Sequence, residues 1–296
     1  MSRAAKPITF TLNGTINDDS IAFLGSQLTL NSTPQNIPSG ATQVTLNGGA
    51  GNDTITTDTP YGTASQPVFY DGGAGTDTLD LSHMSEAVWV RLSSTNTKHG
   101  AQPYIATQFT VEFMAGSGGD ATDPNALVTS AAEAHHNLAN IESLVGTQYN
   151  DYLELGYYAG SADGGAGNDR LIGGGSGDHL LGGAGDDFLF GKGGNDVMTG
   201  GSGADQFEVI TGNGDDVITD FNVADGDSLY IGWQSSTDVL PAASSWHATT
   251  WTDSSGLSHQ AITASFTGGS VTLVDLTMAD VQTVMAHTTE FHFLNG

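Results

Sequence analysis

A nine-residue alternation of glycine, acidic and apolar positions dominates the middle of the chain. Residues 164–208 divide without a gap into nonapeptides of the pattern G-G-x-G-x-D-x-U-x, in which U is apolar. We number each repeat from its first glycine. Position 8 is then Leu171, Leu180, Leu189, Met198 and Phe207, and position 6 is Asp169, Asp178, Asp187, Asp196 and Asp205. Such a period predicts a stacked-repeat architecture with one inward side chain per repeat.

Less regular copies of the pattern lie on both sides of this block. They are GTQYNDYLE (146–154), TGNGDDVIT (211–219), GGAGNDTIT (48–56), GGAGTDTLD (72–80) and the degenerate GTINDDSIA (14–22). The two flanking copies place Asp151 and Asp216 at position 6, with the second offset by two residues. The upstream copies have no neighbouring repeat in the sequence, so their spacing alone does not predict where they stack.

Most of the remaining sequence has the pattern of short strands. Residues 28–30, 44–46 and 88–92 alternate or cluster apolar side chains, and 262–266 with 271–274 form a hairpin pattern around Gly268-Gly269. A helix is predicted over 277–287, with Thr277 as its N-cap and Asp280 in its first turn. A weaker helical pattern covers 131–138, and 116–126 has the composition of a loop.

The charge balance excludes several classes of protein. The 296 residues contain 33 Asp+Glu and 6 Lys+Arg, for a formal net charge of -27. Six positive residues cannot form the basic face that nucleic acid or an anionic membrane requires. No apolar run reaches the length of a membrane-spanning helix, and the absence of cysteine excludes disulfides. An external cation is the simplest way to neutralise such a chain.

The repeat has the composition of a cation-binding turn. Glycine at positions 1, 2 and 4 permits positive φ, and the last three residues form a short strand. Successive repeats run in opposite directions, so 18 residues complete one coil. Asp151, Asp169, Asp187 and Asp205 then form one column, and Asp178 and Asp196 form another. Carboxylates about 5 Å apart repel by about 3 kcal/mol at an effective dielectric near 20, so empty columns should be unstable.

Calcium fits these turns better than other common metals. Ca²⁺ takes six to eight oxygen ligands, whereas Mg²⁺ keeps its waters and Zn²⁺ prefers His or Cys. Backbone carbonyls together with side-chain oxygens would supply the cage. The candidate ligand residues are Gly48, Gly49, Gly51, Asp53, Gly72, Gly73, Gly75, Asp77, Asp151, Gly164, Gly165, Gly167, Asn168, Asp169, Gly173, Gly174, Ser176, Asp178, Gly182, Gly183, Gly185, Asp186, Asp187, Gly191, Gly194, Asn195, Asp196, Gly200, Gly203, Asp205, Asp215, Asp216, Asp220 and Asp227.

With its contiguous repeats, the chain resembles the RTX, or haemolysin-type calcium-binding repeat, family. The segments 72–82, 140–144 and 212–221 also resemble RTX sequences. The resemblance implies a parallel β-roll, folding driven by Ca²⁺, and export by a type I secretion system through an uncleaved carboxyl-terminal signal, here 271–296. The first ten residues lack the apolar stretch of a secretory signal peptide, which fits that route.

Some positions depart from the RTX pattern and predict weaker sites. Lys192 replaces the second glycine of its repeat, and Gly177 and Ala204 replace the oxygen-bearing residue at position 5. Tyr149 stands where a glycine is expected, which predicts that the 146–154 turn binds no metal. Asp220, Asp225 and Asp227 are as well explained by turn formation as by a terminal Ca²⁺ site.

No catalytic motif stands out. The chain has neither H-E-x-x-H nor G-x-S-x-G. Adjacent His135 and His136 would diverge on a helix. Glu86, Glu112 and Glu133 could form a carboxylate pair, although nothing in the sequence fixes them together. Three tryptophans could stack sugars, but packing in a β core or an interface is the more common role of such residues; they are Trp233, Trp246 and Trp251.

These patterns predict an all-β protein: a β-rich amino-terminal region (1–145), a calcium-binding β-roll (146–227) and a carboxyl-terminal β cap with the export signal (228–296). We expect a secreted, non-enzymatic calcium-binding protein that self-associates at the cell surface, as a surface-layer subunit, filament subunit or adhesin. Nucleic-acid binding and membrane insertion are not expected. Two alternatives stay open: a secreted polysaccharide-acting or hydrolytic enzyme with its site in 81–145, and a non-catalytic carboxyl-terminal module of a longer exported protein.

Overall fold

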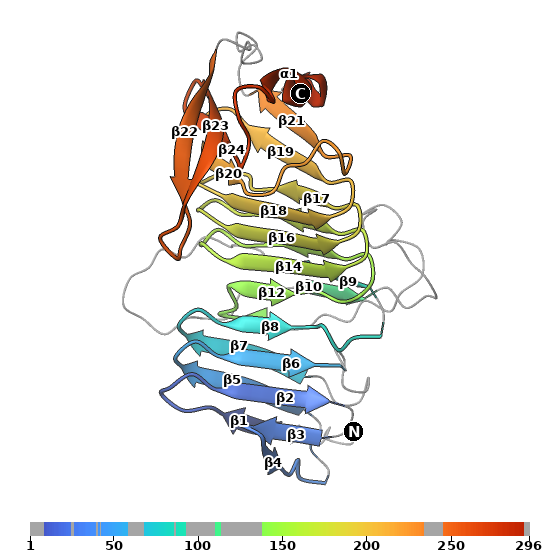
Figure 1. Cartoon of the computed structure of the whole chain (residues 1–296). Helices are drawn as coiled ribbons and strands as arrows, with labels where there is room; N and C mark the ends of the chain where they lie inside the picture. The colour runs from blue at the N-terminus through green and yellow to red at the C-terminus, as the bar shows by residue number, and fades with distance from the viewer. Residues whose placement is uncertain are drawn as a thin grey trace.

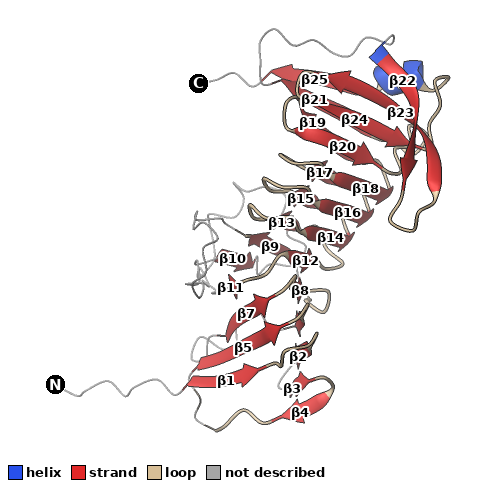
Figure 2. Cartoon of the chain, turned by 90° about the vertical axis from the view of Figure 1, so that its left-hand side faces the viewer, coloured by secondary structure: helices blue, strands red, loops and turns tan. Residues whose placement is uncertain are grey.

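The structure, a computed structural model, has the predicted parallel β-roll. It describes residues 9–24, 27–39, 41, 43–58, 68–85, 87–92, 110–113, 138–233 and 245–292. Figure 1 shows the strands stacked as rungs from the amino-terminal end to the carboxyl-terminal end, and Figure 2 shows the two sides of the stack. The predicted helix at 131–138 and the predicted loop at 116–126 fall almost entirely outside the described residues.

The regular repeats form the central coils as the nonapeptide pattern predicts. On one side lie β13 (Tyr152–Glu154), β15 (Arg170–Ile172) and β17 (Phe188–Phe190). On the other lie β14 (Ser161–Ala166), β16 (His179–Ala184) and β18 (Val197–Ser202). Parallel pairing aligns residues one coil apart, for example Leu171 with Leu189 on the first side and Ala162 with Leu180 on the second.

Two long sheets and one short sheet contain the described strands. The eight-stranded sheet has the order β10-β9-β13-β15-β17-β19-β21-β25 and the thirteen-stranded sheet has the order β22-β23-β24-β20-β18-β16-β14-β12-β8-β6-β2-β3-β4, while β1-β5-β7-β11 form the four-stranded sheet. The amino-terminal strands are β1 (Thr9–Asn13), β2 (Ser20–Leu24), β3 (Gln27–Leu30), β4 (Thr33–Gln35), β5 (Gln43–Ala50), β6 (Thr54–Thr57), β7 (Val68–Ala74), β8 (Thr78–Asp80), β9 (Val88–Arg91), β10 (Thr110–Phe113), β11 (Leu138–Ala139) and β12 (Ser143–Val145). The carboxyl-terminal ones are β19 (Gln206–Ile210), β20 (Gly214–Ile218), β21 (Ser228–Trp233), β22 (Trp246–Thr252), β23 (Ser258–Phe266), β24 (Gly269–Val274) and β25 (Thr288–His292).

The isolated upstream copies belong to the same stack as the central repeats. β2 pairs in parallel with β6, β6 with β8, and β8 with β12, which in turn pairs with β14. Leu79, Leu144 and Ala162 therefore stand in one row. Both long sheets also continue into the predicted cap, through the pairs β20–β24 and β19–β21. The sheets thus run through the predicted divisions at 145/146 and 227/228.

Alternation of side chains places one apolar residue of each short strand inside the roll. The position-8 residues Leu171, Leu189, Met198 and Phe207 are fully buried, with 0% exposure. They belong to one core cluster that runs from Leu12 to Val284. Burial of this row stabilises each central coil, and a second, smaller apolar cluster is formed by Tyr152 and Ile172 with Phe188 and Phe190.

The predicted hairpin is present, and the predicted helix is shorter than expected. β23 and β24 pair antiparallel around Thr267 and Gly268. The helix α1 covers Val281–Ala286, with Asp280 as its N-cap and no side-chain capping hydrogen bond. Thr277 is therefore not the cap. Its backbone N–H and hydroxyl instead donate to Asp280 Oδ2, at 2.8 and 2.7 Å, which holds a separate turn before the helix. No helix in the described part of the chain is long and apolar enough to cross a membrane.

Candidate metal-binding turns

The position-6 aspartates before the eight-stranded sheet form a continuous column, which we call the first column: Asp151, Asp169, Asp187, Asp205 and Asp227. The backbone N–H of each donates to Oδ1 of the next, with the 151–169 and 169–187 distances both 2.7 Å. The N–H groups of Asp187 and Asp205 continue the chain of bonds at 2.9 Å each. These bonds use one oxygen of each accepting carboxylate and bring like charges together in neighbouring turns.

The second column lies before the thirteen-stranded sheet and includes the upstream repeats. Its members are Asp19, Asp53, Asp77, Glu142, Asp178, Asp196 and Asp216, joined by the same kind of backbone-to-carboxylate bond except between Glu142 and Asp178. At that break Gly160 occupies the position and donates its N–H to Asp178 Oδ1. The stacking of Asp53 and Asp77, which the sequence left open, places them in the same column as the regular repeats.

The second oxygen of several column carboxylates is buried without a hydrogen-bond partner. These are Oδ2 of Asp53, Asp77, Asp169, Asp187 and Asp196. The residues are at most 2% exposed. Burial raises the pKa of Asp77 to about 6, of Asp187 to about 7 and of Asp169 to about 8. A buried anionic oxygen without a partner is costly, so these atoms require a cation or a proton.

Glycine at position 1 leaves the space in which such a cation would lie. A Cβ added to Gly164 would come within 3.0 Å of both Asp169 Oδ2 and the Gly182 carbonyl oxygen. A Cβ added to Gly182 would meet Asp187 Oδ2 and the Gly200 carbonyl oxygen in the same way. A carboxylate oxygen of one turn and a carbonyl oxygen of the next turn therefore face one small volume that only glycine leaves open.

This donor set fits a hard divalent cation with oxygen ligands. Within the described ranges, no three His, Cys, Asp or Glu side chains converge on one point. The cage must then be completed by backbone carbonyls, which suits Ca²⁺ with its six to eight oxygen ligands and flexible geometry. Two glycines of such a turn adopt the left-handed region that this arrangement needs, as Gly165 (φ 96°) and Gly167 (φ 114°) do.

The comparison with known families agrees with this geometry. The RTX calcium-binding nonapeptide repeat family matches in four copies, at residues 43–59, 145–180, 156–189 and 172–207. The repeats are RTX calcium-binding repeats. Proteins with RTX calcium-binding repeats are typically secreted.

The other comparisons add little. The crystal structure of the extracellular lipase LipA from Serratia marcescens matches with 15% sequence identity and a TM-score of 0.26, over 97% of this chain and 41% of the lipase chain. This chain thus spans less than half of that structure. A similarity this low carries no argument about activity. No curated protein matches.

The structure brings most predicted RTX site residues together in the turns. The position-1 glycines Gly48, Gly72, Gly164, Gly173, Gly182, Gly191 and Gly200 each lie against the aspartate of their own turn. Positive φ is found at Gly49, Gly51, Gly73, Gly75, Gly165, Gly167, Gly183, Gly185, Gly194 and Gly203. Among the position-2 glycines predicted as ligands, Gly174 is the exception, because its φ is not positive.

Position 5 has a contact that the sequence did not suggest. Oδ1 of Asn168 accepts the N–H of Asp186 at 3.0 Å, and Oδ1 of Asp186 accepts the N–H of Ala204 at 2.9 Å. Asn195 accepts the N–H of Asp215 at 3.0 Å in the other set of turns. These bonds are exposed and join neighbouring turns, and the ligand role of Asn168, Asp186 and Asn195 stays a prediction.

Three further candidates are also bonded elsewhere. Asp220 accepts the N–H groups of Gly200 and Gly201, one on each carboxylate oxygen, at 2.9 and 2.8 Å. Asp215 accepts the hydroxyl of Ser270 at 2.8 Å. The hydroxyl of Ser176 donates to the Tyr157 carbonyl at 3.0 Å. Each of these contacts links neighbouring turns or strands, and the ligand role of the three residues stays a prediction.

Sequence reasoning missed Glu142 as a member of the second column. Its Oε2 accepts the N–H of Asp77 at 2.9 Å, and a Cβ on Gly72 would meet the Asn140 carbonyl. The signal was present, because Glu142 stands two residues before the buried Leu144, the offset at which the repeats place aspartate. The separation of 65 positions between Asp77 and Glu142 concealed it.

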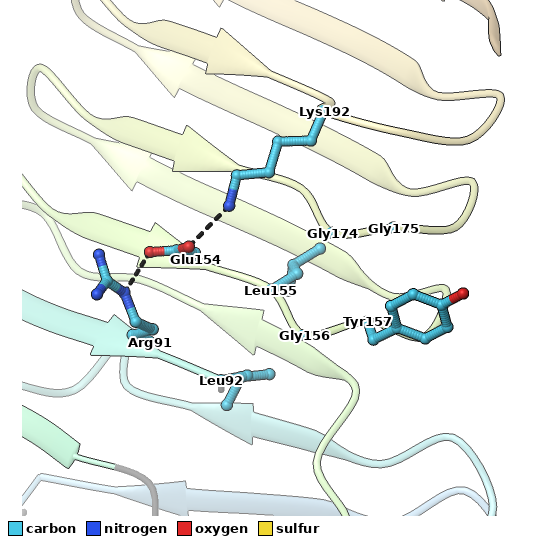
Figure 3. A pocket seen from close by; sticks show the side chains of 9 residues that line it. All are labelled: Arg91, Leu92, Glu154, Leu155, Gly156, Tyr157, Gly174, Gly175 and Lys192. Carbon is cyan, nitrogen blue, oxygen red and sulfur yellow. Dashed lines mark hydrogen bonds and ion pairs between the residues drawn. The ribbon is translucent and has the colours of Figure 1, made fainter. Parts of the chain in front are cut away.

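A basic cluster on the outside of the roll was also missed. Lys192 Nζ lies 2.7 Å from Glu154 Oε1, and Arg91 Nε contacts Oε2 of the same carboxylate (Figure 3). These side chains line an open groove of about 320 Å³, together with Tyr157 and the backbone of Gly174 and Gly175. The Arg91–Glu154 pair joins the neighbouring strands β9 and β13, and the Lys192–Glu154 pair spans from β13 past β15 to the turn after β17, where Lys192 departs from the RTX pattern.

Proposed function

We propose that this chain is a secreted structural protein whose calcium-loaded roll self-associates at the cell surface, as a surface-layer subunit, filament subunit or adhesin. The observation that carries the proposal is the thirteen-stranded sheet, which runs without a break from β4 near the amino-terminal end to β22 near the carboxyl-terminal end and makes the described chain one elongated body. Such a body presents long faces and strand edges as pairing surfaces, rather than a closed pocket around a reacting group.

Charge complementarity supports contact between copies. Arg91, Arg170 and Lys192 are the Lys and Arg side chains of the described ranges, and all lie on or beside the outer face of the eight-stranded sheet. Tyr157 next to them is 59% exposed. The turns carry further acidic side chains, among them Asp18 and Asp186. In a polyanion of charge -27, these three cations, two of which share Glu154, are the groups that the acidic turns of a second copy would contact.

The assembly proposal is tested with Arg91→Gln and Lys192→Gln in one chain, a pair that keeps hydrogen-bond donors beside Glu154. Sizing and negative-stain microscopy in millimolar calcium are expected to show assemblies for the wild type and dissociated chains for the double variant. Gln206→Ala, on the same sheet but uncharged, is the matched control and should assemble. A wild type that stays monomeric at high concentration with calcium contradicts assembly, and a double variant that assembles normally contradicts this contact.

Export and the absence of catalysis belong to the same proposal. Cytosolic calcium lies far below the range of about 10⁻⁴–10⁻³ M at which extracellular calcium modules bind, so the chain would stay loose inside the cell and fold outside. If residues 271–296 fail to carry a reporter out of cells with a type I exporter, the route is wrong. Turnover on a glycan or ester panel that Glu112→Gln or Glu133→Gln abolishes would contradict the non-enzymatic assignment.

A further inference from the structure

The RTX turns fall into two conformations that differ at position 2. In the turns 48–53, 72–77, 164–169 and 182–187, position 2 has positive φ, between 96° at Gly165 and 110° at Gly183. Lys192 of the turn 191–196 has φ 67° and belongs with them. We call these the open turns. Their aspartates are Asp53, Asp77, Asp169, Asp187 and Asp196, the residues whose Oδ2 has no hydrogen-bond partner. Gly201 and Gly212 also have positive φ, but Asp205 and Asp216 are not among these residues, so the turns 200–205 and 211–216 are assigned to neither set.

In a second set of turns, the aspartate is satisfied by its own backbone. The position-2 N–H donates to Oδ2 at 2.5 Å in three of them, from Thr15 to Asp19, Thr147 to Asp151 and Gly174 to Asp178. Asn222 donates to Asp227 Oδ2 at 2.7 Å in the last coil. None of these four donors has positive φ. We call these the closed turns.

The backbone conformation explains the difference. When position 2 has positive φ, its N–H turns away from the aspartate, and the residue joins the ladder between coils, where Gly49 pairs with Gly73 and Gly165 with Gly183. When φ is negative, the N–H points into the turn and donates to Oδ2. This is the carboxylate oxygen that would otherwise face the volume left open by the position-1 glycine. Carbonyl oxygens of the next turn are present in both cases, as Gly146 and Gly173 show. The two sets therefore differ in whether Oδ2 of the aspartate already accepts a hydrogen bond from its own turn.

We propose that calcium binds at the open turns, and that in the closed turns a backbone N–H takes the place of the metal. Calcium would therefore bind at Asp53, Asp77, Asp169, Asp187 and Asp196, and not at Asp19, Asp151, Asp178 or Asp227. This division differs from the repeat pattern, because the family match at 145–180 includes the closed turns of Asp151 and Asp178. It also places a calcium ion at the turn 191–196, where the sequence predicts weaker binding because Lys192 replaces a glycine.

The open turn at 72–77 lies outside the residues that the RTX family matches. Asp77 is 0% exposed, its Oδ2 is unpartnered, and the Asn140 carbonyl faces the volume left open by Gly72. The Glu142 carboxylate is the next member of the column and accepts the backbone N–H of Asp77. A calcium ion here would hold together the two ends of the segment that connects β8 to β12. It would also join the amino-terminal coils to the central roll.

The test compares Asp187→Asn, in an open turn, with Asp178→Asn, in a closed turn. Both changes keep an oxygen for the column N–H and remove one charge. Calcium bound to the full chain is counted by equilibrium dialysis and atomic absorption, at protein concentrations too low for assembly, so that the result does not depend on the proposed self-association. Asp187→Asn is expected to lose at least one bound ion. Asp178→Asn should bind as many ions as the wild type, with a lower melting temperature.

Two outcomes would overturn the division: an equal loss of calcium from both variants, or no loss from Asp187→Asn. If Asp187→Asn does not fold, the same comparison is made with Asp53→Asn in an open turn and Asp19→Asn in a closed one. Asp77→Asn extends the test to the segment that connects β8 to β12, where it is expected to remove an ion and to increase proteolysis between residues 81 and 139 before the central roll is cut.

Discussion

Truncating Phe207 to alanine is expected to lower the free energy of unfolding of the calcium-loaded chain by about 3–5 kcal/mol, the usual cost of removing a buried aromatic ring. Phe207 is fully buried at position 8 of the last regular repeat, and its ring centroid lies 6.0 Å from that of Phe221. Denaturant unfolding at saturating calcium measures the change.

The control for Phe207 is Leu257→Ala. Leu257 is 61% exposed, so its truncation should change the free energy of unfolding by less than about 0.5 kcal/mol. If the two variants were equally stable, the inward row of position-8 residues would not be the core of the roll.

Without calcium, the roll is expected to gain order as the pH falls from about 8 to about 5.5. Burial raises the pKa of Asp151 and Asp187 to about 7 and that of Asp169 to about 8, whereas an aspartate in the unfolded chain titrates near its ordinary value. At pH values between the ordinary pKa of aspartate and the raised pKa values, the folded chain binds more protons than the unfolded chain. Its stability therefore falls as the pH rises, and the penalty is complete only above the raised pKa values.

Circular dichroism of protein freed of calcium on a chelating resin, at constant ionic strength, measures this effect. With calcium present the trend should reverse, because protons compete with the metal, and the calcium midpoint should rise in acid. A calcium-free chain with more β signal at the higher pH than at the lower would contradict the assignment of the buried carboxylates as uncompensated anions.

The regular part of the fold follows from sequence because its geometry is local. A fixed spacing of nine residues determines the coil length, so Leu171 and Leu189 must align and Asp169 must stack between Asp151 and Asp187. The amino-terminal coils have no such constraint. Their column partners are separated by 34, 24 and 65 residues, and only the packing of the whole chain brings Asp19, Asp53, Asp77 and Glu142 together.

The conformation of individual turns could not be predicted from residue type. Lys192 takes positive φ although a side chain disfavours it, and Gly174, which could adopt positive φ freely, does not. In the first case the ion pair with Glu154 anchors the side chain in the groove. In the second, the N–H of Gly174 bonds Asp178. A glycine lowers the cost of the open conformation but does not impose it.

A calcium titration followed by circular dichroism, then reversed with EGTA at neutral pH, tests the central claim that the metal holds the carboxylate columns together. The wild type is expected to gain its β signal in the range of about 10⁻⁴–10⁻³ M calcium and to lose it with chelator. The chain with Asp169→Ala and Asp187→Ala should require markedly more calcium or fail to respond. A wild-type β signal that EGTA leaves unchanged would contradict the account.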